Sequence, residues 1–385
     1  MKIGLFTDTY VPDTNGVVTV IRLMERELTR AGHRVYVFAP AYPGHAEVRA
    51  DVHRFPSVRM VLYEGMRIAL PVVSRSVLRR ISSLDIVHSH DPFSVGQVAF
   101  WAARWYKIPH VHTYHTLYME YRRYLPRPLR PPPRTVEHLS RTFCNRCDTI
   151  VAPSRPMEKE LRTYGVTVPI YPLPFGVDEE DFAHPIEWNM RQESGLVTND
   201  LLLFAGRLGW EKNVDFLLRA FRQLLPERPH ARLVIAGGGP HHKNLEQLAA
   251  DLGVADKVTF TGQLPRERLI DLYKQATLFV FASKTETQGL VLVEAMMAGL
   301  PPVALGRMGA LDVVTHGETG LLVEEDESEF AAACLRLLAN EGERRRLGEA
   351  ARAWAVSQSA RSSTAKLIRI YEEVAARRVS SPPRS

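Results

Sequence analysis

Two glutamates, Glu286 and Glu294, flank a short turn in the second half of the chain. The apolar run before Glu286 predicts a strand, and the run after the turn predicts a helix that starts near Leu290. Between them, Gln288 and the conformationally permissive Gly289 form the turn. Exposed amides at a helix N-terminus bind anions or hydroxyl oxygens, so the turn is a candidate site for a phosphate or a sugar.

Glu294 lies among apolar neighbours on the predicted helix. A carboxylate in such surroundings needs a polar partner, because burying an unpaired charge is costly. The diol of a sugar or a ribose can be that partner through two charge-assisted hydrogen bonds. A structural pairing, with an arginine or with a helix terminus, satisfies Glu294 equally well. Chemistry alone leaves both alternatives open.

A second candidate element carries two cations in a loop between a predicted strand and a predicted helix. Arg207 offers a guanidinium fork for phosphate oxygens, and Lys212 offers a compact positive charge. Asn213 is the predicted N-cap of the following helix, whose dipole favours an anion. These groups suit a diphosphate, although two ordinary surface cations also explain the segment. The string is not a P-loop, because the required glycine and Lys-Ser/Thr spacing is missing.

Glycines follow predicted strands at two further places. Three consecutive glycines at residues 237–239 let backbone approach a ligand closely, but they lack the Gly-x-Gly-x-x-Gly pattern, so dinucleotide binding is weakly supported. In the first half of the chain, Asn15 and Gly16 form a similar loop after the first predicted strand. That loop is equally consistent with a plain helix start.

Histidines gather at the ends of two predicted strands. They are His88, His90, His110, His112 and His115. Metal binding and hydrogen bonding at a sugar site are both compatible with this set. Because alternate residues of a strand face opposite ways, His88 and His90 can share a ligand only if both lie past the strand's end. Cys144 and Cys147 have no second pair, which disfavours zinc.

The net charge of +6 is unevenly distributed along the chain. Residues 1–176 hold 24 Lys and Arg against 14 Asp and Glu, a net charge of +10. The residues of this half that could form a basic, aromatic membrane-surface patch are Tyr118, Tyr121, Tyr124, Arg122, Arg123, Arg127, Arg130, Arg134, Arg75, Arg79 and Arg80. RNA stacking is a rival use that no module signature supports, and a solvated loop remains open.

The elements that must position these residues are predicted by an alternation of short apolar, β-branched runs with amphipathic stretches. The predicted strands span residues 3–8, 35–39, 86–90, 110–114, 149–152, 201–205, 233–236, 258–261, 279–282 and 302–304. Helical periodicity marks residues 17–31 and 214–225, with Gly32 where a helix C-cap is expected. Such βα repeats predict doubly wound parallel sheets of the α/β class, with ligands at the carboxyl ends of the strands.

The alternation breaks at residues 171–178, where two prolines and a glycine predict a hinge. The strands resume near residue 201. We therefore expect a Rossmann-like domain at residues 1–176 and a second one at residues 177–359. An amphipathic helix at about residues 360–377 is compatible with either domain and could pack back on the first.

Composition places the chain among globular proteins. Its 385 residues are 45% apolar and 24% charged, which excludes disordered and fibrous classes. Three cysteines are too few for a disulfide framework and indicate a reducing compartment. The acid at position 8 makes the first segment a strand rather than a signal peptide, and no apolar run approaches the roughly 18–20 residues of a membrane span. We therefore expect a cytoplasmic protein.

Together these motifs resemble the retaining glycosyltransferases of family 4, which have the GT-B fold of two Rossmann-like domains facing across a cleft. The resemblance covers nearly the whole chain, and its strongest mark is the Glu-x7-Glu spacing of Glu286 and Glu294, followed by Ala-Met-Met-Ala-Gly-Leu-Pro. Supporting motifs are Gly206-Arg207 with Lys212, Asn15-Gly16-Val17 and Thr113-Tyr114-His115-Thr116. The loop at residues 306–310 departs from the family, in which many members carry a Gly-Gly pair and then Glu.

The resemblance implies a site for a nucleotide sugar. The residues implied at this site are Gly16, His115, Arg207, Lys212, Glu286, Gln288, Gly289, Leu290 and Glu294. The two cations would bind the diphosphate, Glu294 the ribose hydroxyls, and Glu286 with the amides of the turn the sugar and phosphates. Gly16 would let the N-terminal domain close on the phosphates, and His115 would lie near the reactive face of the sugar.

The resemblance also implies how the transfer proceeds. With retention on the donor's front face, the departing phosphate helps to deprotonate the acceptor, so no protein nucleophile is needed. Arg207, Lys212 and helix dipoles would neutralise the leaving group, so we expect no metal cofactor.

Within the family, the chain most resembles the diacylglycerol glucosyltransferases, in residues 6–10, the Tyr-His-Thr-x-Tyr string and residues 286–289. This implies UDP-glucose as donor, with UDP-galactose or GDP-mannose as competitors, and a lipid acceptor at an anionic membrane surface. We then expect a peripheral enzyme on the inner face of the membrane, without a nucleic-acid partner. The nearest alternative is a GDP-mannose-dependent mannosyltransferase acting on a phosphoinositide or another glycolipid. A sugar-nucleotide epimerase shares the architecture, and a nicotinamide-dependent oxidoreductase is disfavoured by the missing glycine fingerprint.

Overall fold

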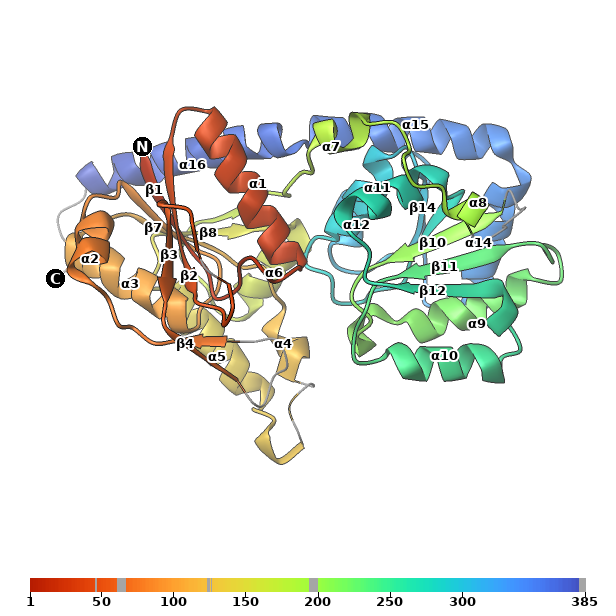
Figure 1. Cartoon of the computed structure of the whole chain (residues 1–385), viewed down its shortest axis with the longest axis horizontal. Helices are drawn as coiled ribbons and strands as arrows, with labels where there is room; N and C mark the ends of the chain where they lie inside the picture. Colours follow the sequence, from red (N-terminus) through yellow and green to blue (C-terminus); the bar gives the residue numbers. More distant parts are fainter. Residues whose placement is uncertain (46, 61–66, 123–124, 126, 194–199, 381–385) are drawn as a thin grey trace. The chain divides into compact units, whose positions relative to one another are not determined.

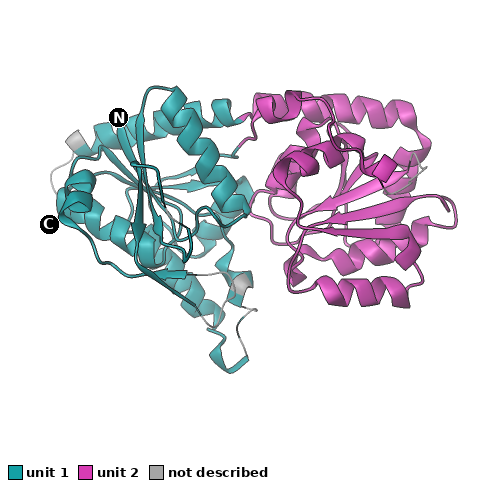
Figure 2. Cartoon of the chain, viewed as in Figure 1, with its two compact units in different colours: residues 1–175, 360–385 teal, residues 176–359 magenta. Residues whose placement is uncertain are grey.

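The chain divides into two compact units in a computed structural model (Figure 2). The structure describes residues 1–45, 47–60, 67–122, 125, 127–193 and 200–380. Unit 1 comprises Met1–Phe175 and Ala360–Ser385, and unit 2 comprises Gly176–Ser359. The boundary lies one residue before the one expected from the sequence. The C-terminal helix, which the sequence left compatible with either domain, belongs to unit 1.

Unit 1 is built on a parallel sheet of seven strands in the order β3-β2-β1-β6-β7-β8-β9 (Figure 1). The strands are β1 (Lys2–Phe6), β2 (Arg34–Pro40), β3 (Val52–Phe55), β6 (Ile86–Ser89), β7 (His110–Thr113), β8 (Thr149–Ala152) and β9 (Ile170–Pro172). The winding reverses between β1 and β6. In doubly wound sheets, ligands bind beyond the carboxyl ends of the strands at such a switch point.

Helices and one hairpin complete unit 1. They are α1 (Gly16–Arg30), the antiparallel pair β4 (Ser57–Arg59) and β5 (Arg67–Ala69), α2 (Arg75–Ser82), α3 (Ser94–Tyr106), α4 (Tyr118–Tyr121), the 3₁₀ turn η2 (Arg127–Leu129), α5 (Pro133–Cys144), α6 (Arg155–Thr163) and α16 (Ala360–Ser380). The long C-terminal helix α16 packs against α1 (Figure 1). Its inner face buries Leu367, Ile370, Tyr371 and Val374.

Unit 2 repeats the architecture with a parallel sheet of six strands in the order β12-β11-β10-β13-β14-β15. The strands are β10 (Leu201–Ala205), β11 (Arg232–Ala236), β12 (Val258–Gly262), β13 (Leu278–Phe281), β14 (Pro302–Leu305) and β15 (Leu321–Val323). Its switch point lies between β10 and β13. Strands β10, β13 and β14 are buried at every residue, as expected for a sheet covered on both faces.

The helices of unit 2 include five of ten or more residues. They are α7 (Glu179–Ala183), α8 (Met190–Glu193), η3 (Trp210–Lys212), α9 (Val214–Leu224), α10 (His242–Asp251), η4 (Ala255–Lys257), α11 (Arg266–Gln275), α12 (Leu290–Met297), α13 (Ala310–Val313), α14 (Glu327–Ala339) and α15 (Glu341–Ser357). Within the described ranges, no helix is long and apolar enough to cross a membrane.

All ten strands predicted from the sequence are present, with ends that differ by at most two residues. Strands β3, β9 and β15 and the β4–β5 hairpin were missed because they are only three or four residues long, and all of them except β15 also carry polar residues or proline. The C-cap of α1 is Ala31, and the predicted cap Gly32 follows it with a φ of +83°. Asn213 does begin α9, but in the left-handed conformation and without a capping hydrogen bond from its side chain.

Two loops at the switch point of unit 2 are held together by their backbones. The amide of Gly206 donates to the carbonyl of Ala236 at 2.9 Å, and the amide of Leu208 donates to that of Gly238 at 2.9 Å. Gly237 has a φ of +144°, and a Cβ there would lie 1.9 Å from the carbonyl oxygen of Gly206. This position therefore requires glycine, and the loop that carries Arg207 depends on it.

We predict that Gly237→Ala lowers the melting temperature of the full chain, because the methyl group overlaps the backbone of Gly206 and the conformation is strained. If the free energy of unfolding falls by about 2 kcal/mol, the melting temperature of a unit of this size falls by about 4 °C or more. The matched control is Gly238→Ala, where a Cβ meets nothing within 4 Å. Equal melting temperatures for the two variants, measured by differential scanning calorimetry, would refute this dependence.

Candidate functional site

The predicted turn lies beyond the carboxyl end of β13, next to the switch point of unit 2. Gly289 adopts the left-handed conformation, with a φ of +83°, and is followed directly by α12. Gln288 is buried. Arg207, which follows the neighbouring strand β10, is exposed. Unit 2 thus places the glutamate turn and the cation loop at the ends of adjacent strands.

Lys212 and Glu286 form an ion pair, with side chains 17% and 21% exposed. The sequence assigned these two residues to the same site without predicting a direct contact between them. Because each neutralises the other, the pair adds no net charge to the loop. An incoming anion would meet an already ordered ammonium and carboxylate.

Glu294 is buried, with its side chain 6% exposed, and both carboxylate oxygens accept hydrogen bonds. Arg266 Nη1 donates to Oε1 at 2.8 Å, and the Tyr273 hydroxyl donates to Oε2 at 3.0 Å. Arg266 also pairs with Asp181 at 2.9 Å. The arginine partner that the sequence left as an alternative is therefore present. A carboxylate has about four acceptor positions, so these two bonds leave capacity for a diol.

Arg266 and Tyr273 were not identified from the sequence. They lie seven residues apart on α11 and thus share one face of the helix, which a search for polar residues at that spacing would have found. Burial, and then the charge of Glu294, raise the pKa of the Tyr273 phenol well above its usual value. The phenol therefore stays protonated and serves as a hydrogen-bond donor to the carboxylate.

The loop that departs from the family pattern supports the glutamate turn. The amide of Gly309 donates to the carbonyl of Glu286 at 2.8 Å. A Cβ at Gly309 would lie 2.6 Å from the backbone of Gln288, so no larger residue fits without a shift. This loop holds the turn in place through its backbone.

Beside the cation loop, Trp210 packs against His241 with a ring-centroid distance of 3.5 Å. The His241 Nε2 atom lies 3.0 Å from both oxygens of Asp215. The indole is nevertheless 62% exposed. This group of side chains, which was not identified from the sequence, fixes the 3₁₀ turn that ends in Lys212.

In unit 1, two aspartates are buried at the switch point between β1 and β6. The Asp8 carboxylate accepts hydrogen bonds from the Ser94 hydroxyl and, at 2.9 Å, from the Val95 amide at the start of α3. Asp91 accepts from the amide of Asp8 at 3.0 Å. Burial, and then the neighbouring Asp8, raise the pKa of Asp91 to about 7. Burial also raises the pKa of Asp8.

His88, His90 and His115 come together at the ends of β6 and β7. The His88 and His90 ring centroids are 4.3 Å apart, although His88 lies within β6 and His90 just past its end. The strand alternation from which the sequence separated these two residues therefore does not apply to His90, because the chain turns directly after Ser89. His90 Nδ1 lies 2.9 Å from His115 Nε2.

The other two predicted histidines form a separate pair. His110 and His112 both lie at hydrogen-bond distance from the Ser89 hydroxyl, at 2.8 and 2.9 Å. Burial lowers the pKa of His110 and of His115 to about 3. The pKa values of His88, His90 and His112 are lowered well below their usual value by the same cause. All five imidazoles are therefore neutral at neutral pH.

Gly16 follows the N-cap of α1. The Asn15 side chain accepts a hydrogen bond from the Val18 amide at 3.0 Å, so the plain helix start left open by the sequence is present. A Cβ at Gly16 would meet nothing within 4 Å. The packing of unit 1 described here therefore leaves room for a larger residue at this position.

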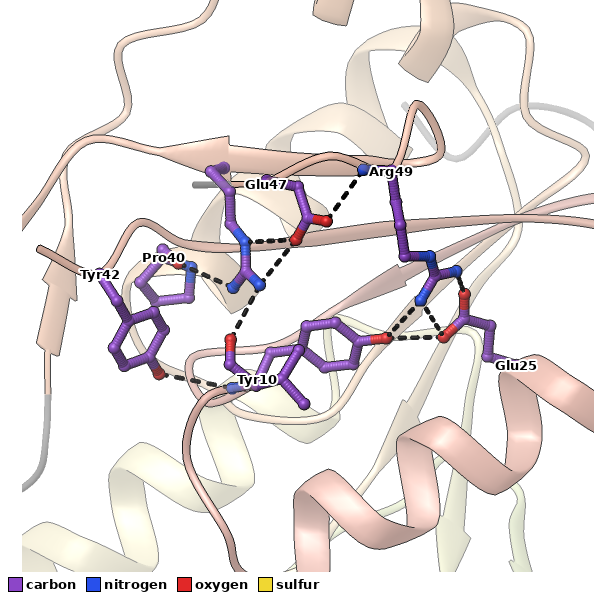
Figure 3. Close-up of polar contacts among 8 residues, drawn as sticks. Tyr10, Glu25, Pro40, Tyr42, Glu47 and Arg49 are labelled. Atoms are coloured by element: carbon purple, nitrogen blue, oxygen red, sulfur yellow. Dashed lines mark hydrogen bonds and ion pairs between the residues drawn. The ribbon is translucent and has the colours of Figure 1, made fainter. Parts of the chain in front are cut away.

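A polar cluster holds the loop between β1 and Gly16 (Figure 3). The Tyr10 hydroxyl donates to Glu25 at 2.6 Å, and Glu25 also forms an ion pair with Arg49. Arg54 donates to the carbonyl of Val11 at 2.8 Å. Side chains from α1, from β3 and from the segment before β3 thus order the loop that leads to Gly16.

A fold of two Rossmann-like units with a Glu-x7-Glu turn at one switch point defines a class of glycosyltransferases. Residues 14–181 match the family described as Glycosyltransferase Family 4, and residues 186–354 match the one described as Glycosyl transferases group 1. The chain is 34% identical over 346 residues to the alpha-monoglucosyldiacylglycerol synthase of Streptococcus pneumoniae, which covers 88% of this chain and 78% of the relative. The protein belongs to glycosyltransferase family 4.

Other relatives carry different names. The GDP-mannose-dependent alpha-mannosyltransferase of Corynebacterium glutamicum is 30% identical, over 84% of this chain and 77% of its own. Among solved structures, Anabaena HepE in complex with UDP and glucose matches 97% of this chain and 100% of its own, with a TM-score of 0.77 and 19% identity. The HepE likeness shows the GT-B fold.

The free energy of unfolding should fall as the pH drops from 7.5 to 5.5. A histidine whose folded pKa is depressed stays neutral while its unfolded form gains a proton, which costs about 1.4 kcal/mol per pH unit below about pH 6.5. Seven histidines of unit 1 act in this direction, the five described above together with His33 and His53, whose pKa values burial also lowers. Asp8 and Asp91, with raised pKa values, gain stability over the same interval. Because seven groups oppose two, the urea midpoint of the full chain should be lower at pH 5.5.

The slope of the unfolding free energy against pH reports how many more protons the unfolded chain binds. His110→Asn should reduce that number by about one. The control is the same change at His230, which is exposed in unit 2. A midpoint that is unchanged or higher at pH 5.5 would contradict the assignment of neutral buried histidines.

Proposed function

We propose that this enzyme transfers glucose, with retention, from UDP-glucose to a membrane lipid such as diacylglycerol. The observation that carries the proposal is the pair of relatives named alpha-monoglucosyldiacylglycerol synthase. The S. pneumoniae protein is 34% identical over 88% of this chain, and the Acholeplasma laidlawii protein is 29% identical over 85%. Those names specify a glucosyl group and diacylglycerol, and we take UDP as the carrier of the glucose from the family resemblance.

We assign donor binding to the site in unit 2. Arg207 and Lys212 bind the diphosphate, and Glu286 holds the sugar together with the amides of Gln288, Gly289 and Leu290. The Lys212–Glu286 pair supports this assignment, because it positions a cation and an acceptor before the donor arrives. No metal is needed in this account, since fixed cations and helix dipoles can stabilise the leaving diphosphate.

Glu294 binds the ribose diol in this proposal. Its carboxylate is held at a fixed position by Arg266 and Tyr273, so it loses little further freedom when the ribose hydroxyls donate to it. A buried carboxylate also makes a stronger hydrogen bond than an exposed one, because the local dielectric constant is low.

Unit 1 contributes Gly16 and His115 to the proposed mechanism. Gly16 allows the close approach of the donor phosphates, and the space around its Cβ position supports this role because packing alone does not require glycine there. His115 binds the transferred sugar as a neutral imidazole, since burial depresses its pKa to about 3.

Binding of a lipid acceptor requires contact with a membrane, and unit 1 has an exposed surface of suitable chemistry. The large apolar residues exposed on or next to α2, α3 and the β4–β5 hairpin are Val58, Ile68, Leu70, Val72, Leu78, Phe93, Trp101 and Trp105. Trp101 and Trp105, 60% and 81% exposed, lie four residues apart on α3, which contacts both α2 and β5. Exposed Arg75 and Arg79 lie on α2. We call α2, α3 and the β4–β5 hairpin the apolar-basic face and propose that it contacts the bilayer.

The patch expected from the sequence differs in several members. The Tyr118 ring packs edge-on against Phe93 and Tyr114 at 5.2 and 5.4 Å, so it is not an interfacial anchor. Arg80 donates to the Tyr36 hydroxyl at 2.9 Å. Arg127 and Arg134 are exposed. The side chain of Tyr121, and the whole of Arg123 and Tyr124, lie outside what the structure describes.

A second candidate is transfer of mannose from GDP-mannose to a phosphoinositide or another glycolipid. It is favoured by the C. glutamicum relative, whose name specifies that donor and whose identity to this chain is 30%. A transfer assay with UDP-glucose, UDP-galactose and GDP-mannose, each with diacylglycerol and with phosphatidylinositol in vesicles, separates the two candidates by the product formed.

Glu294→Gln should weaken UDP-glucose binding about tenfold or more, because the ribose loses a charged acceptor. The matched control is Tyr273→Phe, which removes one bond to Glu294 but leaves the carboxylate. Both variants should melt at a lower temperature than the wild type, but only Glu294→Gln should bind UDP-glucose about tenfold more weakly. Affinity is measured by calorimetric titration in the presence of EDTA, so the same experiment tests whether donor binding needs a metal.

Equal affinities for the two variants would exclude a ribose contact at Glu294. Complete loss of wild-type binding in EDTA, with recovery on adding magnesium or manganese, would contradict the proposal that no metal is required.

The protein should co-sediment with phosphatidylcholine vesicles that contain phosphatidylglycerol, and less with pure phosphatidylcholine. A basic residue near an anionic bilayer contributes about 1 kcal/mol, and salt screens this attraction. Trp101→Ser with Trp105→Ser should reduce binding at all salt concentrations, because the aromatic rings anchor without charge. Arg75→Glu with Arg79→Glu should reduce it mainly at low salt.

The control for charge reversal is Arg345→Glu with Arg352→Glu, on exposed positions of α15 in unit 2. This variant should bind like the wild type. Equal binding of the wild type to both kinds of vesicle, or to neither, would remove the membrane-surface proposal.

A further inference from the structure

The imidazole of His90 connects His115 to the interior of unit 1. His90 is fully buried, and its backbone amide donates to the carbonyl of Phe6 at 2.8 Å. One edge of its ring faces His115, with Nδ1 at 2.9 Å from Nε2 of that residue. The His90 ring also packs on the His88 ring.

His88 is fixed at both of its nitrogens. Nδ1 lies 2.6 Å from the Tyr371 hydroxyl of α16, and Nε2 lies 2.7 Å from the Thr113 hydroxyl of β7. Because His88 cannot rotate without breaking these bonds, it gives the His90 ring a rigid surface to pack on. The orientation of His90 toward His115 is therefore set by the fold of unit 1 itself.

A hydrogen bond across the 2.9 Å contact between the two imidazoles needs a proton on one of the two facing nitrogens. Both rings are neutral, since burial depresses both pKa values, and a neutral imidazole has one N–H and one bare nitrogen. Either His90 donates through Nδ1, or His115 donates through Nε2. The other nitrogen of His90 distinguishes the two arrangements.

His90 Nε2 is buried and has no hydrogen-bond partner among the described residues. If His90 were protonated there, a buried N–H would be left unpaired, which is rarer in proteins than an unpaired acceptor. The proton of His90 therefore belongs on Nδ1, from which it donates to His115 Nε2. His115 must then carry its own proton on Nδ1.

We propose that His90 is a positioning residue that holds His115 in the Nδ1–H tautomer, with Nε2 occupied as an acceptor. In this tautomer Nδ1 of His115 is a hydrogen-bond donor, and its bare nitrogen, Nε2, is occupied by the His90 N–H and so cannot remove a proton. The functional part of this inference rests on the proposed role of His115 in sugar binding, whereas the tautomer does not.

The tautomer is measured by long-range ¹H–¹⁵N correlation spectra of the full chain labelled with ¹⁵N-histidine at pH 7.5. Protonated and bare ring nitrogens resonate in separate regions, and the His115 signals are assigned from their absence in His115→Asn. We expect Nδ1 of His115 to be protonated and Nε2 bare. A protonated Nε2 in His115 would overturn the proposal, whatever the enzyme transfers.

His90→Asn and His90→Phe test the positioning role. The Asn amide can replace the Nδ1–H donor, whereas Phe fills the space without one. With the donor and acceptor that the wild type uses, kcat should fall at least tenfold in the Phe variant, with a smaller change in the KM for the donor, and should recover largely in the Asn variant. Equal losses in the two variants, with equal melting temperatures, would show that the donated hydrogen bond is unimportant.

Tyr371→Phe is the control for general loosening of the cluster. It removes the hydroxyl next to His88 but leaves His90 and its contact with His115 in place. The His115 tautomer should be unchanged in this variant and altered in His90→Phe. A change of tautomer in Tyr371→Phe would contradict the assignment to His90. If the wild type transfers no sugar at all, the proposed function fails while the spectra still decide the tautomer.

Discussion

Burial of both parallel sheets on both faces constrains where polar chemistry can occur in this protein. Strands such as β10 and β13 are buried at every residue and carry no charged side chain, so the ionised groups of the site lie in the loops and helices that follow the strands. The reversal of winding between β1 and β6, and between β10 and β13, leaves room at those ends. The groups to which we assign donor and sugar binding, in both units, lie at or next to these two places.

The polar side chains at the two switch points are stabilised in different ways. Unit 2 keeps ionised groups and pairs them, as in Lys212 with Glu286 and Arg266 with Glu294. Unit 1 gathers imidazoles that burial keeps neutral, together with hydroxyls and two aspartates whose pKa values are raised. Such a difference suits a division of labour in which one unit binds a charged ligand and the other contacts uncharged hydroxyls.

Much of the fold could be predicted from the sequence because buried parallel strands produce continuous apolar runs, which identified ten strands. The position of the turn before α12 was also predictable, because a left-handed backbone conformation favours glycine and Gly289 stands there in the sequence. The partners of Glu294 were not, because Arg266 reaches it from a helix 28 residues earlier, and sequence spacing does not report such contacts. The pairing of His88 with His90 was missed for a related reason, since strand alternation ends with the strand.

The helix α16 has a consequence for the order in which the protein can be completed during synthesis. Unit 2 is continuous from Gly176 to Ser359, whereas unit 1 needs Ala360 and the residues after it. When the last residue of unit 2 leaves the ribosome, unit 1 still lacks the helix that supplies Leu367, Ile370 and Tyr371 to its interior. Unit 1 is thus the first unit to be synthesised and the last to be completed. His88 can contact the Tyr371 hydroxyl only after some 280 further residues have been added.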